Sequence, residues 1–152
     1  MGESQAVLVI DETGFLKKGQ HSAGVARHYS GPAGRIEHCH MGVLLAYASR
    51  QGQALLDGAR YLPPGWTNDR ERCERVGLPE PHPCATKPQW ARQLLERAFD
   101  AKVPAAWVTG ASVYGDDRRR VGVAERAQAY VLAVSGQAYV WRGGSQPQGK
   151  TV

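Results

Sequence analysis

Long hydrophobic runs are absent from this sequence, and none approaches the roughly 20 residues that a membrane-spanning helix needs. The first residues, MGESQAVLVIDE, also lack the basic segment and apolar stretch of a secretory signal. We therefore expect a cytoplasmic protein with no membrane partner. At 152 residues, with 42% hydrophobic and 22% charged residues, the chain is long enough for one domain with a sizeable core.

Cysteine is scarce, and the three cysteines form no C-x-x-C pair. An odd number of scattered cysteines is typical of reduced thiols in a cytoplasmic protein. Two clusters contain zinc-type ligands, His38-Cys39-His40 and the group of Cys73, His82 and Cys84. Alternate residues of a strand face opposite ways, and the second cluster lacks the paired spacing of structural zinc sites. Zinc binding is therefore the less favoured interpretation.

The excess of positive charge is mild. Lysine and arginine number 19 against 14 acids, which gives a net charge of +5 and a pI near 9.3. Such a balance fits a nucleic-acid partner through phosphate neutralisation. Many soluble proteins reach it without one, so charge alone does not identify the partner.

The apolar pattern predicts strands that alternate with helices in the second half of the chain. A first strand at residues 6–10, buried on both faces, is expected to end at Asp11, and residues 15–35 are expected to form a loop or irregular hairpin. Residues 1–140 would form the domain, and residues 141–152 a flexible polar tail. The further strands are predicted at residues 38–48, 53–62, 105–109 and 130–134. The helices are predicted around 68–75, from 86 to before 104, and from 116 or 117 to about 128.

The segment VLVIDETGFLKKGQHSAGVARHYSGPAGRIEHCHMGVLLAYAS, residues 7–49, resembles the start of the catalytic domain in a group of insertion-sequence DDE transposases. Residues 54–66, 86–110 and 113–117 are similar to later parts of the same domain. The resemblance implies an α/β fold, a ribonuclease H-like mixed five-stranded sheet with flanking helices, incomplete here. It also implies DNA cleavage and strand transfer at transposon ends by two Mg²⁺ or Mn²⁺ ions held between carboxylates.

Three acids hold the metals in this family, and the resemblance places only the first of them here. Asp11 matches the first acid, so it is the expected catalytic and metal-binding residue. Ala111 occupies the position of the second acid, and a methyl group binds no cation. Asp116, a few residues on, is expected to cap the next helix rather than replace it. The third acid, a glutamate beyond the fifth strand, has no counterpart in the tail, and we expect a fragment truncated at both ends.

Basic residues in the family-like loops are the expected DNA contacts. The predicted DNA-binding residues are Lys17, Lys18, Arg27, Arg35, Lys87 and Arg118. The alternative is that each is a solvated surface charge, and a salt-sensitive DNA affinity would separate the two.

Three functional hypotheses follow. The first is a transposase-derived core that neither cuts nor joins DNA, because its metal ligands are incomplete. The second is a non-catalytic DNA-binding or regulatory module of a mobile element, which competes or associates with an intact transposase. The third, least favoured, is an active hydrolase in which Asp11, Glu12 and Asp116 form a rearranged metal site.

Overall fold

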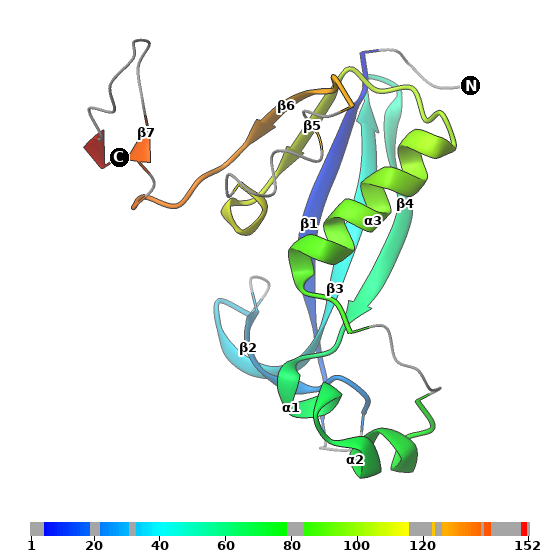
Figure 1. Ribbon diagram of the computed structural model, residues 1–152, viewed down its shortest axis with the longest axis vertical. Helices are drawn as coiled ribbons and strands as arrows, with labels where there is room; N and C mark the ends of the chain where they lie inside the picture. The colour runs from blue at the N-terminus through cyan, green and yellow to red at the C-terminus, as the bar shows by residue number, and fades with distance from the viewer. Residues whose placement is uncertain are drawn as a thin grey trace.

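The computed structural model describes residues 5–18, 22–30, 33–78, 84–115, 123, 126–137, 139–140 and 150–151. Its centre is a mixed sheet of six strands with a helix against one face (Figure 1). The strands of this sheet are β1 (Val7–Leu16), β2 (Ala26–Ser30), β3 (Arg35–Ser49), β4 (Gly52–Tyr61), β5 (Trp107–Gly110) and β6 (Ala129–Leu132).

The 15-residue strand β3 organises the first half of the sheet. It pairs antiparallel with the whole of β1, with β4 through residues 41–49, and with β2 through residues 35–39. A two-residue turn joins β3 to β4, and Ser49 Oγ accepts a hydrogen bond from the backbone N–H of Gln51 there. The hairpin predicted from residues 38–48 and 53–62 is thus confirmed.

The parallel strands β5 and β6 complete the sheet beyond β1. Val7 to Ile10 pair with Trp107 to Gly110, and the same four residues of β5 pair with β6. The predicted α/β fold with a mixed sheet is confirmed, although the sheet has six strands rather than five. The additional strand is β2, which lies in the stretch expected to be a loop or irregular hairpin.

Strand β1 is longer than the sequence suggested. We expected it to stop at Asp11, but it continues to Leu16 because β3 supplies pairing partners as far as Cys39. Gly14 allows this continuation, because a Cβ there would lie only 3.1 Å from Cys39 Sγ. Asp11 is therefore in the middle of a paired strand and not in a turn.

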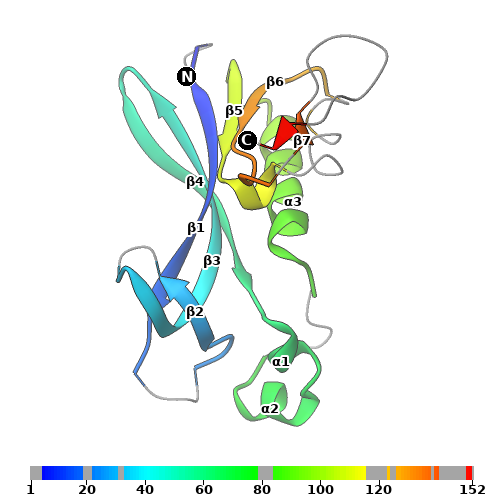
Figure 2. The ribbon, with the colours of Figure 1, turned by 90° about the vertical axis from the view of Figure 1, so that its left-hand side faces the viewer.

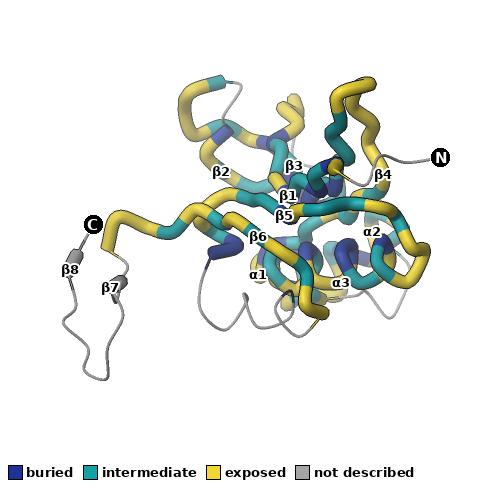
Figure 3. The backbone as a smooth tube through the Cα atoms, turned by 90° about the horizontal axis from the view of Figure 1, so that it is seen from above, coloured by how far each residue is buried: buried dark blue, intermediate teal, exposed yellow. Residues whose placement is uncertain are grey.

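Helix α3 (Lys87–Asp100) covers one face of the sheet and closes the core. Thr86 Oγ1 accepts the backbone N–H of Gln89, and the Gln89 side chain accepts the backbone N–H of Thr86, which forms a capping box. Its buried face packs on inward residues of β1, β3 and β5, and Figure 3 shows this buried layer between helix and sheet. The members of that core include Leu8, Ile10, Val43, Leu45, Leu94, Leu95, Ala98 and Val108.

The opposite face of the sheet is not covered by any helix of the described part of the chain, as the rotated view shows (Figure 2). Apolar side chains on this face are therefore exposed to solvent. The exposed fractions are 66% for Leu55, 45% for Trp107 and 64% for Val131. The expectation that the first strand is buried on both faces is wrong: Leu8 and Ile10 are buried, whereas Val7 and Val9 are half-buried. Alternation of side chains places these valines on the uncovered face.

Two short helices, α1 (Pro64–Thr67) and α2 (Arg70–Arg75), lie beyond the end of β4. Trp66 is buried, and its Nε1–H donates to the Val25 carbonyl over 2.8 Å. Asp69 caps α2 by accepting the backbone N–H of Arg72. The predicted short helix near residues 68–75 is thus confirmed, while α1 was not foreseen.

The C-terminal part contains a small hairpin of β7 (Tyr139–Val140) and β8 (Lys150–Thr151). Between these strands, residues 141–149 lie outside the described residues, so the flexible tail stays a prediction. The helix expected from residue 116 or 117 to about 128 also lies mostly outside the described part of the chain. No described helix is long and apolar enough to cross a membrane.

Candidate functional site

Asp11 stands on the uncovered face of the sheet. Its neighbours Ile10 and Glu12 point toward the α3 side, so alternation turns the Asp11 side chain the other way. The residue is exposed, and its Oδ1 accepts the backbone N–H of Glu12 over 2.8 Å. A carboxylate on a paired, central strand is rigidly placed, which suits a ligand or a catalytic group.

Ala111 is the residue beside Asp11. Ile10 pairs with Gly110, and the chain stays extended at Ala111 with φ −66° and ψ 169°. The next residues of the two parallel strands, Asp11 and Ala111, therefore lie side by side at the carboxyl end of β5. Alternation from Thr109 turns Ala111 toward the uncovered face as well. The position next to the Asp11 carboxylate thus carries a methyl group.

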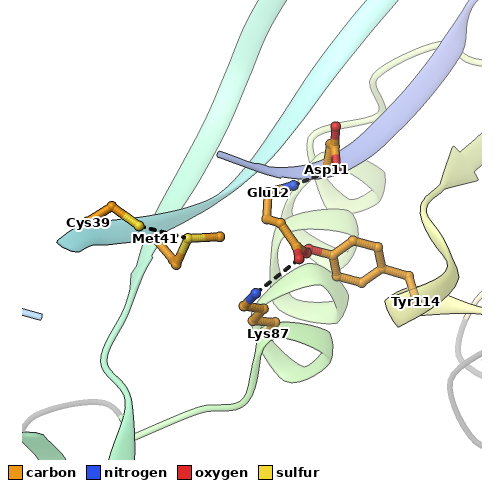
Figure 4. A network of polar contacts seen from close by, with 6 residues as sticks. All are labelled: Asp11, Glu12, Cys39, Met41, Lys87 and Tyr114. Carbon is orange, nitrogen blue, oxygen red and sulfur yellow. Dashed lines mark hydrogen bonds and ion pairs between the residues drawn. The ribbon is translucent and has the colours of Figure 1, made fainter. Parts of the chain in front are cut away.

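Glu12 is part of a polar network on the other face of β1 (Figure 4). Lys87 Nζ is 3.0 Å from Glu12 Oε1, and the Tyr114 hydroxyl donates to Glu12 Oε2 over 2.7 Å. The Glu12 and Lys87 side chains are 24% and 21% exposed, so the ion pair is partly shielded from water. Both carboxylate oxygens are engaged within the protein, and Figure 4 shows Asp11 pointing away from this network.

Tyr114 contributes a protonated phenol to this network. Burial raises its pKa well above the ordinary value, and the hydrogen bond to Glu12 and the negative charges of Glu12 and Asp11 raise it further. Tyr114 belongs to the short helix η1 (Ser112–Tyr114), which follows β5 directly. The bond to Glu12 therefore fixes the segment that carries Ala111 against β1.

A divalent metal does not fit the residues that the structure describes. Among them, no group of three or more histidine, cysteine, aspartate or glutamate side chains could hold an ion. Asp11 has Ala111 as its neighbour, and Glu12 is bound to Lys87 and Tyr114. The remaining candidate from the sequence, Asp116, lies outside the described residues.

The fold turns the members of the first cluster considered for zinc to opposite faces of β3. Cys39 is buried on the α3 side of β3, and burial raises the pKa of its thiol. Strand alternation turns His38 and His40 to the other face. Cys73 is buried and donates its S–H to the Trp66 carbonyl, whereas His82 lies outside the described residues.

The predicted DNA contacts fall into different environments. Lys17 and Lys18 follow β1 and are exposed, as is Arg27 on β2. Arg35 Nε pairs with Glu37 Oε1 at 2.6 Å, and Lys87 pairs with Glu12 as described above. Arg118 lies outside the described residues. Their DNA-binding role stays a prediction.

Sequence reasoning missed the Glu12, Lys87 and Tyr114 network. Its members are separated by 75 and 102 residues along the chain, so no local pattern links them. It also missed a cationic groove near α2, which joins residues from β3, β4 and α2. The one sequence feature that was consistent with such a surface is the net positive charge of the chain.

Comparison with known proteins gives one match. A family model described as DDE superfamily endonuclease matches residues 1–151. No curated protein and no solved structure matches the chain. The family model covers almost the whole sequence, and the mixed sheet with its helices is consistent with a ribonuclease H-like domain of this family.

Proposed function

This chain belongs to the DDE superfamily endonucleases, and from that membership we propose that it binds DNA as a transposase-type domain but does not cut or join DNA on its own. The family is one of transposase-type nucleases, which generally use divalent metals. Transposon ends are the expected DNA. The chain would thus bind DNA as the family does, but it would lack the cleavage and strand-transfer activity of the family.

The observation that carries the proposal is the position of Ala111 beside Asp11, one residue beyond the last pair of β1 and β5, Ile10 with Gly110. In two-metal phosphoryl transfer, carboxylates on neighbouring elements bridge ions about 3.5–4 Å apart. Mg²⁺ prefers hard oxygen ligands and keeps its waters when few are offered. A lone exposed carboxylate beside a methyl group provides no such bridge, so Asp11 alone would hold an ion weakly and transiently.

The contacts of Glu12 argue against a rearranged metal site of Asp11, Glu12 and Asp116. Glu12 is on the α3 side of β1, whereas Asp11 is on the uncovered side. Moving Glu12 to a metal would leave Lys87 without its partner in a partly buried setting and would break the Tyr114 hydrogen bond. Separating a shielded ion pair is costly because a desolvated charge loses its partner.

DNA binding rests on the family and on exposed cations. Phosphate contacts from lysine and arginine supply most of sequence-independent affinity for DNA. Lys17, Lys18 and Arg27 are exposed at the same end of the sheet, near the β1 terminus and β2. The net charge of +5 favours approach to the polyanion.

A nicking assay tests the catalytic half of the proposal. Purified protein is incubated with supercoiled plasmid in Mg²⁺ or Mn²⁺, and the Asp11→Ala variant is the matched control. We expect no nicking by wild type above the level of the control. Metal-dependent nicking that Asp11→Ala abolishes would overturn the proposal.

A binding assay tests the DNA half separately. Fluorescence anisotropy with a labelled duplex should show an affinity that falls steeply as salt rises from about 50 to 200 mM. An affinity that does not change with salt, or no binding at the lowest salt, would contradict DNA as the partner. The two assays thus show separately whether the catalytic half or the DNA-binding half of the proposal is wrong.

A further inference from the structure

A cationic groove of about 920 Å³ lies between the end of the sheet and the two short helices. These helices are in the lower part of Figure 1. Among the described residues, its lining includes four cationic side chains and no carboxylate. The cationic residues are Lys17 after β1, Arg60 of β4, and Arg72 and Arg75 of α2. His40 of β3 also lines the groove.

Helix α2 is attached through α1 to Val25, the residue before β2, which limits the positions that its arginines can take. Trp66 anchors the pair of short helices through its hydrogen bond to the Val25 carbonyl, and Cys73 donates its S–H to the Trp66 carbonyl over 3.1 Å. The guanidinium carbon of Arg72 lies 3.8 Å from the centroid of the Trp66 ring. This stacking orients the planar guanidinium before any ligand arrives.

The positive charges of the groove have no carboxylate partner in the part of the chain that the structure describes. Within the described residues no carboxylate pairs with Lys17, Arg60, Arg72 or Arg75. In contrast, Arg70 of the same helix pairs with Glu74 at 2.9 Å. Burial lowers the pKa of His40, and the charges of Lys17 and Arg60 lower it further, as expected beside unopposed cations.

Two groups of the groove share a sheet face with Asp11. Phe15 pairs with His40, and Gly42 pairs with Arg60, so alternation puts the side chains of His40 and Arg60 on the uncovered face. Lys17 is six residues after Asp11, which is roughly 20 Å along an extended chain at about 3.3 Å per residue. An extended polyanion lying on this face can therefore pass Asp11 and enter the groove.

We propose that this groove binds the phosphodiester backbone of DNA, at a contact site separate from the Asp11 position. Guanidinium groups match phosphate oxygens in paired hydrogen bonds, and cations from three elements suit a continuous chain of phosphates. Such contacts fix the position of the DNA and do not read its sequence. The inference rests on the proposed function in one respect, that DNA is the ligand.

The test compares two double variants with equal loss of charge. Arg60→Gln/Arg75→Gln removes two groove cations, and both side chains are exposed. Arg70→Gln/Arg92→Gln is the matched control, because these arginines pair with Glu74 and Glu96 and do not line the groove. Circular dichroism and urea unfolding verify that all proteins are folded. Affinity for a fluorescein-labelled duplex of mixed sequence is then measured by anisotropy over a series of salt concentrations.

We expect the groove variant to bind about tenfold or more weakly than wild type at low salt. The slope of log K against log salt should also fall by about 2, since each duplex phosphate contact contributes about 0.9. The control variant should change both quantities much less. Equal losses of DNA affinity in the two variants would show that the groove is not the contact site, although the protein would still bind DNA.

Two further outcomes separate this inference from the proposed function. Absence of duplex binding by wild type would overturn the proposed DNA partner and the groove together. Preferential displacement of the labelled duplex by unlabelled RNA would overturn DNA as the ligand of the groove. DNA binding by wild type and by the control variant, together with a loss of affinity in the groove variant, would support both the proposed function and the groove as its contact site.

Discussion

The hydroxyl of Tyr114 donates a hydrogen bond to Glu12 Oε2 over 2.7 Å, and this bond ties the segment after β5 to the middle of β1. Glu12 is at the same time paired with Lys87 at the start of α3. One carboxylate therefore connects a strand, a long helix and a short helix. Because Ala111 directly precedes η1, the same bond helps to set the distance between Ala111 and Asp11.

Replacing Tyr114 by phenylalanine should lower the free energy of unfolding. The side chain is buried and its partner is charged, so the loss is expected to be about 1.5–3 kcal/mol. Urea unfolding of wild type and Tyr114→Phe measures it. In a double-mutant cycle with Glu12→Gln, we expect the two changes to be coupled. Additive effects would show that the charge of the Glu12 carboxylate does not strengthen the bond.

Restoring a carboxylate beside Asp11 should create a metal site without restoring DNA cleavage. Ala111→Asp places two carboxylates next to each other on adjacent strands, and we expect calorimetry to detect Mn²⁺ binding that wild type lacks. Cleavage should stay absent, because the described residues offer no third ligand. Ala111→Asn is the matched neutral control, and Asp11→Ala/Ala111→Asp should lose the metal. Equal Mn²⁺ binding by the aspartate and asparagine variants would contradict the expected pairing.

The ion pair between Arg97 and Asp57 should stabilise the fold only above acidic pH. Arg97 Nε donates to Asp57 Oδ2 over 2.8 Å, and this hydrogen bond is the main cause that holds the pKa of Asp57 below its ordinary value. Because the pKa of Asp57 is lower in the folded protein than its unfolded value of 3.8, the ion pair stabilises the fold fully above pH 3.8. This stabilisation is lost as the pH falls through the pKa of Asp57 in the folded protein. Since both groups are partly exposed, the contribution is expected to be at most about 1 kcal/mol.

Chemical denaturation of Asp57→Asn and wild type at several pH values measures this contribution. The difference in the free energy of unfolding should be largest near neutral pH and should vanish in strong acid. Arg97→Gln should show the same profile, because it removes the other partner of the same bond. A difference that persists unchanged in strong acid would assign the effect to packing and not to the ion pair.

DNA should raise the pKa of His40. In the free protein, burial and the charges of Lys17 and Arg60 lower this pKa, while Phe15 packs beside the ring with centroids 5.2 Å apart. A bound phosphate offsets those charges, so protonation of the imidazole becomes easier and the affinity for DNA should rise as pH falls through the raised pKa of His40 in the complex. NMR titration of His40 with and without duplex measures the shift. His40→Gln should remove the added pH dependence, and an unchanged pKa would place the phosphates elsewhere.

The sequence predicted those elements whose signals are local. The hairpin of β3 and β4 has a clear turn between apolar strands, and α3 begins at a capping threonine followed by Pro88. In each case, neighbouring residues along the chain determine the structure.

The rest depends on contacts between distant segments. Strand β1 extends beyond Asp11 only because β3 continues to pair with it, and α1 is held by the bond from Trp66 to Val25, 41 residues away. The four cations of the groove are brought together by the sheet and α2, so their spacing in the sequence carries no signal. Patterns of periodicity cannot reveal such partners.

The exposed, extended position of Ala111 also has a genetic consequence. A change of the second base converts any alanine codon into a codon for aspartate or glutamate, so one nucleotide change in the gene can place a carboxylate next to Asp11. The backbone at Ala111 is of a kind that any L-residue adopts, and its side chain faces solvent, so the fold itself does not oppose such a reversion. A carboxylate at this position is thus one base substitution away, and a population carrying the gene would sample it repeatedly.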